Sequence, residues 1–134
     1  MPSVLDANAW IGFLRGTSRK LRDRIAAAPP TEVFVCSVVL AELYRGALRG
    51  RDPDRERAVV DDLLRPYRSL PFDDDAAFHH AHIRVHLDRL GTPIGPYDLL
   101  IAAIARSRGL TVVTHNTGEF NRVPGLAVED WEAD

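Results

Sequence analysis

The sequence holds a single cysteine, Cys36, so a disulfide within the chain is excluded. Cys36 lies in the apolar run 33-VFVCSVVL-40, where a buried thiol that fills space is favoured over a nucleophile or a metal ligand. Long apolar runs are missing too, and none approaches the roughly 20 residues of a membrane-spanning helix. A charged and then apolar leader is also missing. We therefore expect an intracellular, cytoplasmic protein that does not enter a membrane.

Glycine loops that hold phosphate groups are absent, because neither GxxxxGKS/T nor GxGxxG occurs in the chain. A basic excess, which is typical of nucleic-acid-binding modules, is absent as well, since the net charge is −2. The charges are nevertheless uneven: residues 1–68 carry 12 Arg or Lys and 9 acidic residues, whereas residues 69–134 carry 5 and 10. This distribution fits either a basic face beside an acidic pocket or a chance unevenness.

The pattern of apolar residues predicts one α/β domain over residues 1–134, a length that suits a single core. Strands are predicted at residues 3–6, 33–36, 68–72, 110–114 and 126–128. Helical spacing occurs at residues 10–14, 21–25, 39–48, 55–64, 73–90 and 96–109. Ser37 is the predicted N-cap of the third helix, and Asp73 or Asp74 that of the fifth. Strands that alternate with helices indicate a parallel sheet covered on both faces.

In such a fold the site lies beyond the carboxyl ends of the strands. The polar residues that follow the predicted strands are therefore the first candidates. They are Asp6, Glu42 in the helix that follows Ser37, and the run Thr114, His115 and Asn116.

Another candidate, Asp98, opens the apolar segment 93-PIGPYDLLIAAIARSRG-109. Asp6 and Asp98 both fall at helix starts, where a carboxylate stabilises by about 0.5–2 kcal/mol as a cap or first-turn acid. The structural explanation of Glu42 is a surface ion pair with Arg45, worth about 0.2–0.5 kcal/mol. Each explanation suffices for one acid. Several acids at one strand-end crevice, however, would repel one another unless a cation lay between them.

A hard divalent cation would meet that need. Mg²⁺ takes oxygen ligands and keeps several waters, whereas zinc favours His and Cys, of which only His115 lies near these acids. A carboxylate-held Mg²⁺ activates a bound water and offsets phosphate charge, which is the chemistry of phosphodiester hydrolysis.

Four stretches of the chain resemble the PIN-domain family, specifically the VapC-type toxin ribonucleases of bacterial toxin–antitoxin pairs. They are 4-VLDANAWIGFLRG-16, 37-SVVLAELYRGA-47, 93-PIGPYDLLIAAIA-105 and 111-TVVTHNTGEFNRVPGLAVEDW-131. They occur in the family's order and spacing and span nearly the whole chain.

The resemblance implies a PIN-like three-layer α/β/α sandwich around a parallel sheet of four or five strands, usually as a homodimer. It also implies a cluster of acids that binds Mg²⁺ or Mn²⁺ and cleaves RNA. The family's first three acids fall on Asp6, Glu42 and Asp98, the expected metal ligands, and its fourth position, often Asp, falls on Asn116. An amide brings no charge, so Glu119 is a possible substitute. Residues expected to support the ligands are Asn8, Thr114 and Glu119.

Three arginines, Arg15, Arg45 and Arg49, are candidates for the RNA backbone, although each also suits a solvated helix surface. The family's partners are an RNA substrate and a cognate VapB-type antitoxin that covers the acids. Two alternatives remain open at this point. One is a PIN nuclease of RNA maturation or decay, against which the short chain argues; the other is a non-catalytic PIN module, supported only by Asn116.

Other features have structural explanations. His79, His82 and His86 follow helical spacing on one face, but three ligands at best and no nearby Cys favour packing or a partner contact over zinc. The run 73-DDD-75 suits a helix start. Aromatic side chains expected in the core or an interface, rather than stacked on bases, are Trp10, Phe13 and Trp131.

Overall fold

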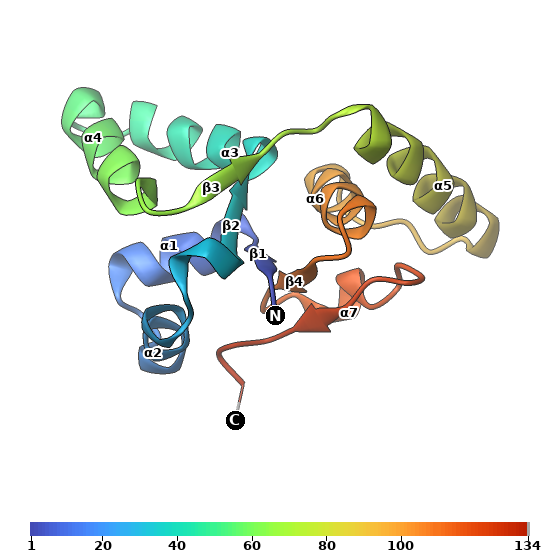
Figure 1. Ribbon diagram of the computed structural model, residues 1–134. Helices are drawn as coiled ribbons and strands as arrows, with labels where there is room; N and C mark the ends of the chain where they lie inside the picture. The colour runs from blue at the N-terminus through green and yellow to red at the C-terminus, as the bar shows by residue number, and fades with distance from the viewer. Residues whose placement is uncertain (134) are drawn as a thin grey trace.

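Five short strands form one parallel sheet in the order β3-β2-β1-β4-β5 (Figure 1). They are β1 (Ser3–Leu5), β2 (Val33–Cys36), β3 (Arg68–Leu70), β4 (Thr111–Val113) and β5 (Val128–Glu129). The computed structural model describes residues 1–133. The predicted α/β class with a parallel sheet is confirmed, and the sheet has five strands.

Helices cover both faces of this sheet. Figure 1 shows α1–α4 on one side and α5–α7 on the other. Their bounds are α1 (Ala7–Arg15), α2 (Arg19–Ala27), α3 (Ser37–Leu48), α4 (Pro53–Leu64), α5 (Asp74–Leu90), α6 (Pro96–Ser107) and α7 (Thr117–Phe120), with a 3₁₀ turn at Pro30–Glu32. The expected three-layer arrangement is therefore present.

The topology creates a switch point between β1 and β4. The connections that leave β1 and β2 lie on one face, whereas those that leave β3 and β4 lie on the other (Figure 1). The backbone NH of Asp6 donates to the carbonyl of Val113 (3.1 Å), which holds the ends of these two strands together. Because ligands of open parallel sheets bind at such switch points, the residues after β1 and β4 are placed for function.

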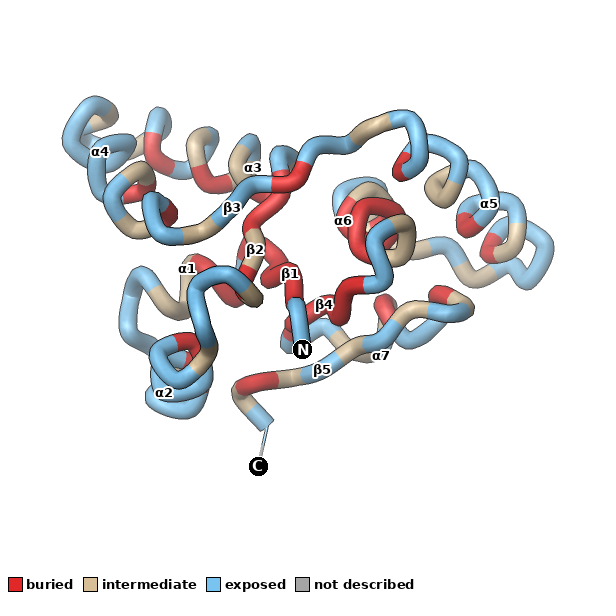
Figure 2. Tube along the Cα trace, in the orientation of Figure 1, coloured by how far each residue is buried: buried red, intermediate tan, exposed pale blue. Residues whose placement is uncertain are grey.

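The core is centred on β1, β2, β4 and one side of α6, where buried residues concentrate in Figure 2. In α6, Leu99 and the run 101–105 are buried, so the helix predicted to pack against the sheet does so. Cys36 is fully buried, and burial raises the pKa of its thiol to about 11. This thiol is therefore a space-filling group, as predicted. No helix within residues 1–133 has the length and apolar character needed to cross a membrane.

Some local predictions were wrong. Ser37 is not an N-cap: it is the first residue of α3, Cys36 precedes it, and no side chain caps the helix. The third strand ends at Leu70 instead of residue 72, because Pro71 has no NH to donate to a ladder. The last strand starts at Val128 rather than at residue 126. The predicted cap Asp73 is confirmed, since its Oδ1 accepts from the NH of Ala76 (3.0 Å).

Candidate active site

Four acids and one amide gather at the carboxyl edge of the sheet. Asp6 follows β1, and Glu42 lies in α3, the helix that follows β2. Asp98 lies in the first turn of α6, which runs back toward the start of β4. Asn116 and Glu119 belong to the turn after β4 and to α7. We call these five residues, Asp6, Glu42, Asp98, Asn116 and Glu119, the acidic cluster.

Asp6 is buried and held on both carboxylate oxygens. Its Oδ1 accepts from the NH of Ala9 (2.9 Å), so Asp6 is indeed the N-cap of α1. Its Oδ2 accepts from the Thr114 hydroxyl (2.6 Å), and that hydroxyl also accepts from the NH of Asn116 (2.9 Å). Burial nevertheless raises the pKa of Asp6, against the lowering effect of these two bonds. The cap explains the position of Asp6 but leaves a buried carboxylate short of positive charge.

Asp98 meets Asn116 and Glu119. The Asn116 side-chain amide donates to Asp98 Oδ2 (3.3 Å) and also to Glu119 Oε2, while the NH of Gly95 donates to Glu119 Oε1 (3.2 Å). Glu119, predicted as a supporting residue and a possible substitute for the family's fourth acid, thus lies directly beside Asn116, the residue at that position. The turn that carries Asn116 and the turn that starts α6 form one acidic surface.

Asp98 has the most perturbed carboxyl group of the cluster. Burial, a hydrogen bond shared with Glu119 and the charges of Glu119, Asp6 and Glu42 raise its pKa from 3.8 to about 7. The pKa of Glu119 moves the other way, chiefly because the Asn116 amide stabilises its carboxylate. Near neutral pH, the four acids therefore resist carrying their charges all at once when no cation is bound.

Glu42 does not form the predicted ion pair with Arg45, and none of the ion pairs within residues 1–133 involves it. Burial and then the charge of Asp6 raise its pKa. The surface-pair explanation is therefore wrong, and Glu42 belongs electrostatically with Asp6 and Asp98.

The residues of the acidic cluster suit a hard divalent cation. All five offer oxygen atoms, and no Lys or Arg in the described chain forms an ion pair with these acids. The arrangement is open, since no three of their carboxylates within residues 1–133 place oxygen atoms all within 4.8 Å of one another.

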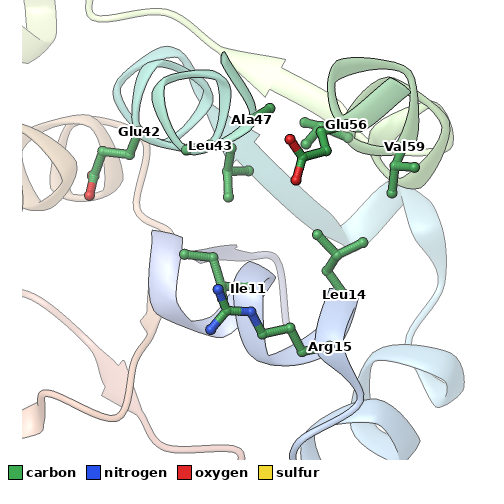
Figure 3. Close-up of a pocket in the computed structure, with 10 residues that line it drawn as sticks. Ile11, Leu14, Arg15, Glu42, Leu43, Ala47, Glu56 and Val59 are labelled. Atoms are coloured by element: carbon green, nitrogen blue, oxygen red, sulfur yellow. The ribbon is translucent and has the colours of Figure 1, made fainter. Parts of the chain in front are cut away.

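Two open pockets adjoin the cluster and share Glu42. The first, which we call the apolar groove, lies between α1, α3 and α4, and Figure 3 shows Ile11, Leu14, Leu43 and Val59 facing it. The second, which we call the side pocket, lies between α1, α3 and the first turn of α6. Arg15 lines the apolar groove; Asn8, Arg45 and Arg49 line the side pocket. No hydrogen bond in the described chain links Asn8 to an acid of the cluster, so its supporting role stays a prediction.

The other predictions from sequence have clear outcomes. The Arg106 guanidinium donates to His79 Nδ1 (2.9 Å) and pairs with His82 Nδ1 (3.0 Å), so two of the three histidines are packing residues. Trp10 is fully buried against Phe13 and Tyr67. Trp131 is buried too, and Arg24 lies over its ring.

Two features of this edge escaped the sequence analysis. Tyr97, which is 56% exposed, lines the side pocket beside Asp98. The sequence signal for Tyr97 was a bulky aromatic residue at the second position of a helix, next to a candidate acid. His115, Asp130 and Glu132 place ligand atoms within 4.8 Å of one another, and His115 Nδ1 lies 3.0 Å from Asp130 Oδ2. The pairing of β4 with β5 brings the exposed His115 and the two half-buried acids together.

Comparison with known proteins agrees with the fold and the acidic edge. Residues 3–126 match the PIN domain, and the chain belongs to the PIN-domain family. It is 41% identical over 128 residues to the tRNA(fMet)-specific endonuclease VapC of Salmonella typhimurium, covering 96% of each chain. It is also 41% identical over 100 residues to Ribonuclease VapC2 of Haemophilus influenzae, covering 75% of this chain and 76% of that one. Within its family, the chain is therefore a nuclease of the VapC group.

Solved structures of VapBC complexes are also similar to this chain. The chain superposes on a crystal structure of DNA-bound VapBC from Salmonella typhimurium with a TM-score of 0.91 and 40% identity, over 98% of each chain. It superposes on VapBC2 from Rickettsia felis bound to a promoter DNA fragment with a TM-score of 0.90 and 28% identity, over 98% and 99% of the two chains.

Proposed function

We propose that the chain is an endoribonuclease that depends on Mg²⁺ or Mn²⁺ and reacts at the acidic cluster. The observation that carries this proposal is the crowding of four acids at one edge of the sheet: burial and the neighbouring carboxylates together raise the pKa of Asp98, which favours a bound proton. A divalent cation removes the need for that proton, because it supplies the missing positive charge.

Asp6 and Asp98 are the proposed metal ligands. Glu119 supplies the charge that Asn116 lacks, and Asn116 holds Glu119 and Asp98 in place through its amide. Thr114 fixes Asp6 by donating its hydroxyl proton to Oδ2. A cation held by these residues would polarise a phosphate oxygen and lower the pKa of a bound water.

Glu42 is the proposed proton acceptor of the reaction. Its pKa is raised and it borders both open pockets, so it can reach solvent and take a proton. The water oxygen forms a bond to phosphorus and gives its proton to Glu42, while the bond from phosphorus to the 3′ oxygen breaks. The leaving oxygen takes a proton from solvent, so the products carry a 5′ phosphate and a 3′ hydroxyl.

The proposed substrate is tRNA in the cytoplasm. This choice is supported by two relatives with 41% identity over 96% of their length whose name is tRNA(fMet)-specific endonuclease. The structures that match are VapBC complexes, which supports a VapB-type antitoxin as the protein partner. The apolar groove that ends at Glu42 is the proposed seat of that antitoxin (Figure 3). The family resemblance further supports a homodimer.

Incubation of the purified chain with total tRNA and Mg²⁺, followed by mapping of the new ends, tests the substrate. We expect cleavage at one position in one tRNA or a small set of them, with 5′ phosphate ends. Intact tRNA beside efficient cleavage of ribosomal or messenger RNA would contradict the tRNA proposal but leave the nuclease proposal standing.

A further inference from the structure

Apart from Glu42, the residues that line the side pocket have no role in the reaction proposed above. The pocket measures about 350 Å³ and opens beside Glu42, so it adjoins the acidic cluster directly. Ala41 and Gly46 leave it wide, and a Cβ added at Gly46 would meet nothing within 4 Å. The pocket therefore has room for a group much larger than a water molecule.

One wall of the side pocket is cationic. Arg45 in α3 and Arg49 at its C-cap are four residues apart, both are exposed, and neither side chain forms an ion pair or hydrogen bond in the described part of the chain. Like charges at this spacing repel each other and slightly destabilise a helix. An anion that bridges both guanidinium groups would relieve this repulsion, and phosphates are suited to their planar forks.

An aromatic ring also lines the side pocket. Tyr97 precedes Asp98 in the first turn of α6, and successive helical residues point about 100° apart, so one turn serves both the acidic cluster and the side pocket. The Tyr97 ring is 56% exposed, and among residues 1–133 no ring contact or hydrogen bond holds it. A free aromatic face and two arginines in one pocket are the combination that binds single-stranded nucleic acid.

We propose that the side pocket binds one unpaired nucleotide next to the cleaved bond, with its base stacked on Tyr97 and its phosphates on Arg45 and Arg49. The position of the cleaved bond rests on the proposed nuclease function. The consequence is a requirement for unpaired RNA: a base held in a duplex cannot turn its face to Tyr97 without leaving the helix. Tyr97 is then a determinant of substrate structure rather than a ligand of the metal.

Binding of a single-stranded RNA of about eight nucleotides tests this proposal. The RNA carries the fluorescent base 2-aminopurine and is titrated in chelator, where no cleavage occurs. We expect Tyr97→Ala to weaken binding about tenfold and to remove the quenching that stacking causes, whereas Tyr97→Phe keeps both. Phe78→Ala is the matched control, because Phe78 is an exposed aromatic residue of α5 away from the pocket.

Salt titrations test the cationic wall. Arg45→Gln and Arg49→Gln are each expected to lower the dependence of log affinity on log salt by about 0.7. Equal RNA affinity and equal quenching in wild type and Tyr97→Ala would overturn the proposal, as would a loss in Tyr97→Ala of antitoxin binding alone, which would assign the pocket to a protein.

The outcomes separate the two proposals. If wild type fails to cleave any RNA but Tyr97→Ala still loses affinity and quenching, the nuclease proposal fails and the nucleotide site stands. If wild type cleaves RNA with the same KM as Tyr97→Ala, the nuclease proposal stands and the nucleotide site fails.

Discussion

At the scale of single residues, Asp98 is the acid whose charge is most disfavoured in the metal-free protein. It starts a buried helix, yet burial and three neighbouring acids disfavour its charged form and raise its pKa to about 7. The folded state therefore binds a proton that the unfolded chain releases near its ordinary pKa of 3.8. Stability from this group is complete below about pH 4 and is lost as the pH rises to about 7.

We predict that Asp98→Asn removes this loss, because an amide cannot ionise. Between about pH 4 and pH 7, the melting temperature of the metal-free wild type should fall more than that of the variant. Thermal melts in chelator measure this difference, and Asp75→Asn, an exposed acid of α5 outside the cluster, is the control. Parallel curves for wild type and Asp98→Asn would show that Asp98 is only a first-turn acid.

The three main acids could be located from the sequence because each has a simple position. Asp6 follows a strand, Asp98 follows a helix-starting proline, and Glu42 lies in a helix that leaves the sheet edge. The contacts of Asn116 with Asp98 and of Glu119 with Gly95 could not be predicted, since they depend on how the short helix α7 packs against the start of α6. The place of Tyr97 depends in the same way on α6 meeting α3.

At the scale of elements, hydrophobic periodicity was sufficient for helices α1–α6 and for the buried strands β1, β2 and β4, but the four-residue helix α7 was not predicted. The edge strands β3 and β5 were less predictable, because each has a neighbour on only one side and its ends depend on local hydrogen bonds. The cap of α3 was missed for a related reason. The chain passes from β2 into α3 without a loop, so Ser37 is already helical.

The apolar groove between α1, α3 and α4 gives a prediction at this scale. Val59 is 43% exposed and lines the groove, so Val59→Asp should leave the fold intact while placing a charge where the antitoxin would bury apolar surface. We expect antitoxin affinity to fall by about tenfold or more, measured by calorimetry.

Val85→Asp is the matched control for this prediction. Val85 is 47% exposed on α5 and lies outside the groove, so this variant should bind the antitoxin as wild type does. Equal affinity of the Val59 and Val85 variants would place the antitoxin elsewhere on the molecule.

At the scale of the whole molecule, the switch point between β1 and β4 explains why residues far apart in sequence meet. Asp6 and Thr114 are 108 residues apart, yet they share a 2.6 Å hydrogen bond because β1 pairs with β4. The first half of the sequence carries the excess of basic residues, and three of its arginines lie near the acids in the fold. Arg15, Arg45 and Arg49 border the pockets beside the acidic cluster. Acids at the switch point and arginines beside them lie where the proposed metal-dependent reaction on a polyanion needs them.

The most direct test of this account is the rate of tRNA cleavage by wild type, Asp98→Asn and the control Asp75→Asn, each with Mg²⁺ and with chelator. We predict that wild type and Asp75→Asn cleave at equal rates, that Asp98→Asn is slower by about 100-fold or more, and that chelator stops all three. Cleavage by Asp98→Asn at the wild-type rate, or cleavage by wild type in chelator, would contradict a metal-dependent reaction at the acidic cluster.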